Sequence, residues 1–175
     1  LAVPAILGEA FCTLRGTPMT NSERLASTAQ GAMTGLFDDF FDKDYLSDEA
    51  VENIIQNQGE SGHKKSNQVL FDIFYKTALD HVPDKKSLIN ALIDVYKAQV
   101  SSKLQVNPHI AHEALLDITM HKGGSSVLFY RTAFSPAINE AEQQLIFNLG
   151  AMMQLGNDIF DVYKDRESGI STLIT

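Results

Sequence analysis

Residues 135–165 read SPAINEAEQQLIFNLGAMMQLGNDIFDVYKD, and this stretch decides the fold class. Its apolar side chains recur every three or four residues, which is the period of an amphipathic helix. Ser135-Pro136 is a helix start signal, with serine as the N-cap and proline at the first helical position. A helix from there to Asp165 would be about 30 residues and therefore roughly 45 Å long. The stretch therefore predicts one long helix through the core of a protein.

The rest of the chain has the same helical pattern, interrupted by turn residues. Thr20 and Glu23 form a capping box, which predicts a helix that runs to about Asp42. Four more helices are expected, at about 47–58, 66–81, 84–106 and 108–134. The paired glycines Gly123-Gly124 should bend or break the last of these. Strand signals are nearly absent, so the sequence predicts an all-α fold, with residues 1–175 in a single domain.

The composition restricts the partners of the chain. A net charge of −8 argues against a nucleic-acid partner bound through a basic surface. It also means that a polyanionic metabolite would need a divalent cation beside it. Cys12 is the single cysteine, which fits a cytoplasmic location and excludes a disulfide framework. No apolar run reaches the ~18 residues of a transmembrane segment.

An acidic motif lies near the end of the first long helix. Asp38 and Asp42 are four residues apart in Asp38-Asp39-Phe40-Phe41-Asp42, so they share one face of that helix. A helix C-terminus carries partial negative charge, so carboxylates there need a cation. Hard oxygen ligands of this kind suit Mg²⁺. The alternative is a solvated acidic helix face.

A second motif lies at the end of the last helix. Asn157, Asp161 and Asp165 are spaced four and four, which aligns an amide and two carboxylates on one stripe. Lys164 and Arg166 follow, as cations suited to the outer oxygens of a diphosphate. The solvated acidic face is less expected here, because large apolar side chains surround the motif. Together the two motifs predict a magnesium–diphosphate site.

These residues resemble the class I isoprenoid synthases. The stretch from Asp38 to Asp42 looks like the aspartate-rich motif of that superfamily. Residues 154–165, QLGNDIFDVYKD, resemble its second metal motif, and three subfamilies share features with them. The Asn157 spacing is similar to the Asn/Ser/Glu triad of terpene cyclases. The start at Gln154 resembles the trans-prenyl diphosphate synthases, and the whole stretch is similar to squalene and phytoene synthases.

The resemblance implies an antiparallel helical bundle around a central cavity that binds a prenyl diphosphate. It implies three Mg²⁺ ions, with catalytic ligands from both motifs, namely Asp38, Asp42, Asn157, Asp161 and Asp165. Side chains that contact the substrate would be Lys122, Lys164, Arg166, Gln154 and Phe41. Other phenylalanines that the resemblance suggests for an apolar cavity are Phe37, Phe129, Phe147 and Phe160. Ordinary core packing is the alternative for each phenylalanine.

The reaction stays open between condensing two prenyl chains and cyclising one, each with release of pyrophosphate. The Arg-Arg-Gly that follows the first motif in chain-elongating synthases is replaced here by Lys43-Asp44-Tyr45. This departure supports a second hypothesis, a catalytically silent prenyl diphosphate-binding or protein-interaction module of the same fold. The chain begins at Leu1 and stops after Thr175, so we expect it to be part of a longer protein, with helices after the second motif missing. A homodimer is one option for its assembly.

Overall fold

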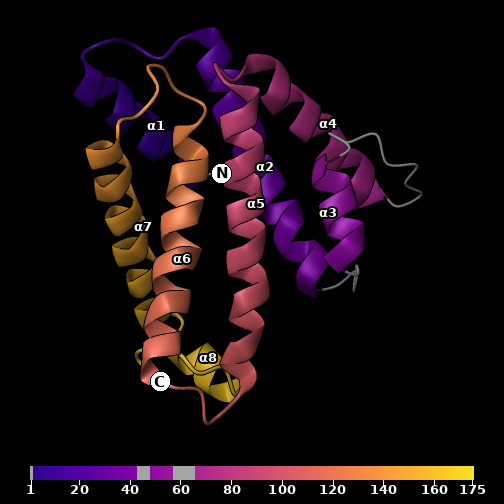
Figure 1. The fold of residues 1–175 in the computed structure, drawn as a ribbon, viewed down its shortest axis with the longest axis vertical. Helices are drawn as coiled ribbons and strands as arrows, with labels where there is room; N and C mark the ends of the chain where they lie inside the picture. Colours follow the sequence, from indigo (N-terminus) through magenta and orange to yellow (C-terminus); the bar gives the residue numbers. More distant parts are fainter. Residues whose placement is uncertain (1, 43–47, 57–65) are drawn as a thin grey trace. The chain divides into compact units, whose positions relative to one another are not determined.

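The computed structural model describes residues 2–42, 48–56 and 66–175, without the side chains of residues 2, 38–42, 48, 50 and 52. These residues form eight α-helices and one short 3₁₀ helix, and they contain no strand. In chain order they are α1 (Ala2–Arg15), α2 (Asn21–Asp42), α3 (Asp48–Gln56), α4 (Ser66–His81), α5 (Lys85–Ser102), η1 (Lys103–Val106), α6 (His112–Arg131), α7 (Glu140–Phe160) and α8 (Val162–Glu167) (Figure 1). The all-α prediction is confirmed. Within the described ranges, every helix is too short or too polar to cross a bilayer.

The chain divides into two compact units. Unit 1 comprises Leu1–Ile93 and Tyr130–Ala137, and unit 2 comprises Asp94–Phe129 and Ile138–Thr175. The first acidic motif therefore belongs to unit 1 and the second to unit 2. A single domain over residues 1–175 stays a prediction.

In unit 1, α2 supplies the central buried face and packs against α1 and α4. Met33 and Phe37 of α2 are almost completely buried, as the three–four spacing of the sequence predicts. The Phe37 ring stacks on Phe71 of α4 with 5.8 Å between ring centroids. Next to it, the buried Tyr75 hydroxyl donates a hydrogen bond of 3.0 Å to the Ile55 carbonyl of α3. Aromatic packing thus joins α2 to α4, and the Tyr75 hydrogen bond joins α4 to α3.

The buried carboxylate of Glu23 joins three segments of unit 1. The capping box is confirmed, because the Thr20 amide donates to Glu23 at 2.9 Å and the Glu23 amide donates to the Thr20 hydroxyl at 3.2 Å. The Arg15 guanidinium of α1 donates to the same carboxylate at 2.8 Å, and the Ser135 amide donates to it at 3.1 Å. These donors lower the pKa of Glu23 to about 2, with the Arg15 hydrogen bond as the largest cause.

The predicted helix start at Ser135-Pro136 is wrong. The Ser135 amide donates to Glu23, and the Ser135 carbonyl accepts from Arg15 at 2.6 Å. Because these hydrogen bonds hold its backbone in unit 1, Ser135 is not the N-cap of α7. Instead α7 begins at Glu140, where the Asn139 side chain caps it by accepting from the Glu142 amide at 2.9 Å. The helix also ends earlier than predicted, at Phe160, and α8 follows after a turn at Asp161.

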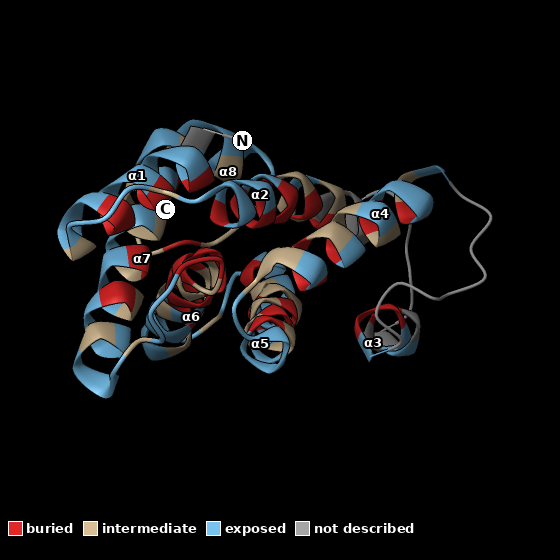
Figure 2. Cartoon of the chain, turned by 90° about the horizontal axis from the view of Figure 1, so that it is seen from above, coloured by how far each residue is buried: buried red, intermediate tan, exposed pale blue. Residues whose placement is uncertain are grey.

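In unit 2, α6 and α7 lie side by side and meet at their glycines (Figures 1 and 2). A Cβ atom at Gly123 would lie 2.0 Å from the Gly150 carbonyl oxygen, and one at Gly124 would lie 2.3 Å from the Phe147 ring. The sequence predicted that Gly123-Gly124 would bend or break a helix. A break is excluded, because α6 runs without interruption from His112 to Arg131. The glycines instead remove the side chains that would keep the two backbones apart.

Gly150→Ala should destabilise unit 2, because its new Cβ would lie 2.2 Å from the Gly123 carbonyl oxygen, which is backbone and has no rotamer to change. We expect a loss of about 3 kcal/mol in the free energy of unfolding, measured by urea denaturation. Gly156→Ala is the matched control in the same helix, since nothing lies within 4 Å of its Cβ position. It should be neutral or stabilising by up to about 1 kcal/mol. Equal effects of the two substitutions would contradict the backbone contact.

Glu23 should make the stability of unit 1 dependent on acidic pH. Its pKa in the folded protein is about 2, below the ordinary 4.5, so its contribution is complete above pH 4.5 and disappears as the pH falls toward 2. Glu23→Gln should remove on the order of 2 kcal/mol at neutral pH and flatten this part of the pH profile. Glu9→Gln is the control, because Glu9 lies exposed and 3.8 Å from an exposed Arg24. Denaturation of the three proteins between about pH 2 and pH 6 tests the difference.

Candidate functional site

A buried carboxyl group, Asp158, lies at the centre of the candidate site in unit 2. Gly150, Gln154 and Asp158 are four residues apart on α7 and share the face that meets α6. The Gln154 Cβ would be 2.8 Å from a Cβ at Gly123, so Gln154 lies against the backbone of α6. One turn further along α7, Asp158 is only 5% exposed.

The two oxygens of Asp158 have different surroundings. Oδ1 accepts a hydrogen bond of 2.8 Å from the Gln154 amide. Oδ2 is buried and has no hydrogen-bond partner, and the same is true of the Thr119 hydroxyl on α6. That hydroxyl is close enough to lower the pKa of Asp158 but lacks the geometry of a hydrogen bond. The site therefore contains two buried oxygens with capacity for a further partner.

Burial raises the pKa of Asp158 above its ordinary value, since a charged carboxylate loses its hydration there. The Gln154 hydrogen bond and the positive charge of Lys122 act in the opposite direction, and the negative charge of Asp165 adds to the increase. An ionised carboxylate with an unpartnered buried oxygen is costly in free energy. A proton or a cation at Oδ2 would remove that cost. The donor set, carboxylate with hydroxyl and amide oxygens, is chemically suited to Mg²⁺.

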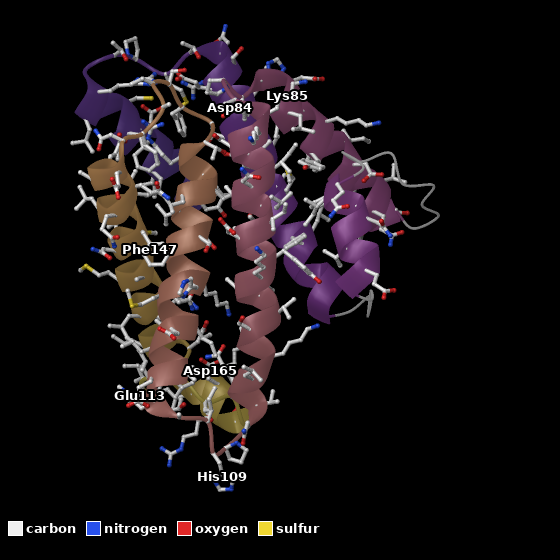
Figure 3. All side chains as sticks on the ribbon, viewed as in Figure 1. Asp84, Lys85, His109, Glu113, Phe147 and Asp165 are labelled. Carbon is white, nitrogen blue, oxygen red and sulfur yellow. The ribbon has the colours of Figure 1, made fainter. Side chains whose placement is uncertain are left out.

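The predicted ligands of the second motif surround Asp158 in sequence but differ from it in burial. Asn157 is exposed, and its amide donates a hydrogen bond of 3.1 Å to the Asp161 carboxylate. Asp161 occupies the turn between α7 and α8, and Asp165 lies half-buried on α8, as labelled in Figure 3. Backbone hydrogen bonds of 2.9 Å from Asp161 to Asn157 and from Asp165 to Asp161 keep the four-residue spacing across the turn.

The unit 2 side chains that were predicted to contact a substrate differ in their exposure and in their distance from Asp158. Lys122 of α6 is half-buried and close enough to lower the pKa of Asp158. Gln154 binds Asp158 and so acts within the motif itself. Lys164 and Arg166 are exposed on α8. Of the predicted cavity phenylalanines in this unit, Phe160 is 90% exposed and so lines no cavity there.

Another of them, Phe147, is half-buried on α7 (Figure 3). Its ring lies edge-on to His121 of α6, at a centroid distance of 5.5 Å. Phe129 in unit 2 and Phe37 in unit 1 are both buried in packed cores. Ordinary side-chain packing, the alternative to a substrate cavity, therefore describes the contacts of Phe147, Phe129 and Phe37 in the structure.

The first motif is described only in part. The backbone of α2 is helical through Asp38 and Asp42, as predicted, but the side chains of Asp38, Asp42 and Phe41 lie outside the described residues. Among the side chains that are described, no three His, Cys, Asp or Glu residues are grouped closely enough to hold a metal ion. Asn157, Asp161 and Asp165 are thus adjacent without forming a closed metal site.

Sequence reasoning did not select Asp158 or Thr119 for the site. The signal was present on α7, because Asp158 continues the four-residue series from Gly150 through Gln154. These residues form the face of α7 that meets α6. Because the helices approach closely at their glycines, a carboxylate on that face is buried.

Comparisons with family models, with curated proteins and with solved structures give no match for this chain. The assignment of a function therefore rests on the residues of the two motifs and on the geometry around Asp158.

Asp158→Asn should stabilise the metal-free protein at neutral pH by about 1 kcal/mol, because the amide removes a buried charge and can donate to Thr119. The pKa of Asp158 is raised, so its contribution to stability is greatest at low pH and decreases as the pH rises through that pKa. The gain should therefore grow in urea denaturation as the pH rises above 3.8, the ordinary pKa of an aspartate. Asp117→Asn on the exposed side of α6 is the control and should change little. A destabilised Asp158→Asn protein in metal-free buffer would contradict the unpartnered oxygen.

Proposed function

We propose that this chain is an Mg²⁺-dependent isoprenoid synthase that ionises an allylic prenyl diphosphate and releases pyrophosphate. The carbocation would then either join a second prenyl chain or cyclise. The observation that carries the proposal is the buried, unpartnered oxygen of Asp158 within a second motif that already resembles a metal motif of this superfamily.

The charges around Asp158 support a diphosphate together with a cation. The chain has a net charge of −8, and Asp158 and Asp165 add negative potential to each other, so a diphosphate alone would be repelled. A bound Mg²⁺ would invert that potential and supply Lewis acidity to the leaving group. The residues that would hold it in unit 2 are Asp158, Asp161 and Asp165, with Asn157 as the further ligand that the resemblance implies. For Asp38 and Asp42 of the first motif, the resemblance implies that they bind two other Mg²⁺ ions.

The side chains of unit 2 have distinct tasks in this proposal. Lys122 would bind an outer oxygen of the diphosphate through a charge-assisted hydrogen bond, as Lys164 and Arg166 would from α8. Gln154 orients Asp158 by binding its Oδ1 atom. The close α6–α7 contact excludes water from one side of the carboxylate, which strengthens its interaction with any cation.

Incubation with Mg²⁺ and farnesyl or geranylgeranyl diphosphate should release pyrophosphate, which a coupled phosphate assay measures. Asp38→Ala and Asp161→Ala should lower the rate by about 100-fold or more, because each removes a carboxylate that the resemblance implies to be an Mg²⁺ ligand. Asp80→Ala is the control, since Asp80 is exposed on α4 with an exposed Lys85 as its partner at 3.4 Å. It should leave the rate unchanged.

Calorimetry on the same protein sample distinguishes between the two hypotheses, an enzyme and a catalytically silent binding module. A silent module would bind the diphosphate in Mg²⁺-dependent calorimetry without releasing pyrophosphate from any prenyl chain length. Absence of both binding and release would reject the prenyl diphosphate site altogether. Asp158→Asn should weaken the Mg²⁺-dependent heat while leaving the fold intact by circular dichroism.

A further inference from the structure

Thr119 of α6 brings a buried hydroxyl group to the candidate site from a second helix. It lies four residues before Gly123, on the face of α6 that meets α7, and it is only 4% exposed. Its hydroxyl is close enough to Asp158 to lower the pKa of that carboxyl group. Both side chains therefore lie in the same interior region, between the backbones that meet at Gly123 and Gly150.

The Thr119 hydroxyl does not use the partner that its own helix offers. Two other helical threonines, Thr13 and Thr77, donate to the carbonyl four residues earlier, each at 2.8 Å. The Thr119 hydroxyl makes no such bond and has no partner among the described residues. A buried hydroxyl without a partner costs free energy, because it has lost its hydrogen bonds to water. The position of this hydroxyl therefore calls for a ligand.

The charges around the hydroxyl favour a cation as that ligand. Asp165 adds to the negative potential at Asp158, and the single ammonium group of Lys122 acts against both carboxylates. A water molecule would satisfy the two buried oxygens but would leave the carboxylate charge uncompensated. A divalent cation takes hydroxyl and carboxylate oxygens as ligands and compensates the charge as well.

We propose that Thr119 is a ligand of the Mg²⁺ ion in unit 2, so that the ion joins α6 to α7. The inference rests on the proposed Mg²⁺ site and adds to it an oxygen from a second helix. The carboxylates of the second motif come only from α7, α8 and the turn between them. Among the described side chains, they do not form a group of three that is close enough to hold a metal. An oxygen from α6 is the addition that such a site needs.

The glycine contact makes this bridge possible and also rigid. Gln154 holds Oδ1 of Asp158 and leaves Oδ2 for the ion, while Gly123 and Gly150 keep the two backbones close. Ligands on two helices that are held in this way need little rearrangement when the ion binds. Binding of Mg²⁺ should therefore stabilise the packing of α6 on α7 and not α7 alone.

Replacement of the hydroxyl by a methyl group of the same shape tests the ligand. Thr119→Val should weaken Mg²⁺ binding by at least about 10-fold in calorimetry with Mg²⁺ alone. In metal-free buffer it should not lower the midpoint of urea denaturation, because the lost hydroxyl has no partner. Thr119→Ser keeps the oxygen and should bind Mg²⁺ more tightly than Thr119→Val.

Thr172→Val is the matched control. Thr172 is equally buried in unit 2, but its hydroxyl accepts a hydrogen bond of 3.3 Å from the Thr175 amide. The substitution should therefore lower the metal-free midpoint and leave the Mg²⁺ affinity unchanged, which is the reverse of the result for Thr119→Val.

Hydrogen exchange measured by mass spectrometry tests the bridge between the helices. At saturating Mg²⁺ the unmodified chain should exchange its amides more slowly in both α6 and α7. In Thr119→Val the ion should slow exchange in α7 but not in α6.

Three results would overturn the inference. They are equal Mg²⁺ affinity in Thr119→Val, no binding of Mg²⁺ to the unmodified chain, and a lower metal-free midpoint in Thr119→Val, which would give the hydroxyl another partner such as a buried water. Pyrophosphate release tests the proposed function separately. A chain that binds Mg²⁺ through Thr119 without releasing pyrophosphate would keep this metal site and reject the enzyme.

Discussion

The contact between the backbones of α6 and α7 is the constraint on which the candidate site depends. No side chain separates Gly123 from Gly150, and this allows Gln154 to lie against α6. One turn later, the same contact buries Asp158 near Thr119 and Lys122. A carboxylate at this position on a more distant pair of helices would be solvated, and its pKa would not be raised. The chemistry of the site thus begins with two residues that have no side chain.

Unit 1 is organised differently, around a charge that is fully paired. Glu23 accepts from α1, from the start of α2 and from the Ser135 amide, so one carboxylate fixes three segments of the chain. Every interaction it makes favours the ionised form, which is why its pKa falls while that of Asp158 rises. The two carboxylates illustrate how a buried acid stabilises a fold in one place and prepares a binding site in another.

Local signals predicted the fold better than the site. The capping box at Thr20 and the helix at 66–81 were correct because their causes lie within a few residues of sequence. Ser135-Pro136 failed because its backbone is bound by Glu23, which is 112 residues away in the chain. The predicted break at Gly123-Gly124 failed for a related reason, since only the position of α7 explains why glycine is needed there. Asp158 was overlooked because its burial comes from that same long-range contact. The role of Asp38 and Asp42 as metal ligands stays a prediction.

The burial of the methionines has a chemical consequence, because Met152 of α7 is 71% exposed whereas Met33 of α2 is completely buried. Thioether sulfur is readily oxidised to the sulfoxide, which is polar and chiral. Oxidants therefore reach Met152 in the folded protein, whereas Met33 is protected by the core of unit 1. Oxidation would in this way change the surface of α7 first and leave the packing around α2 intact.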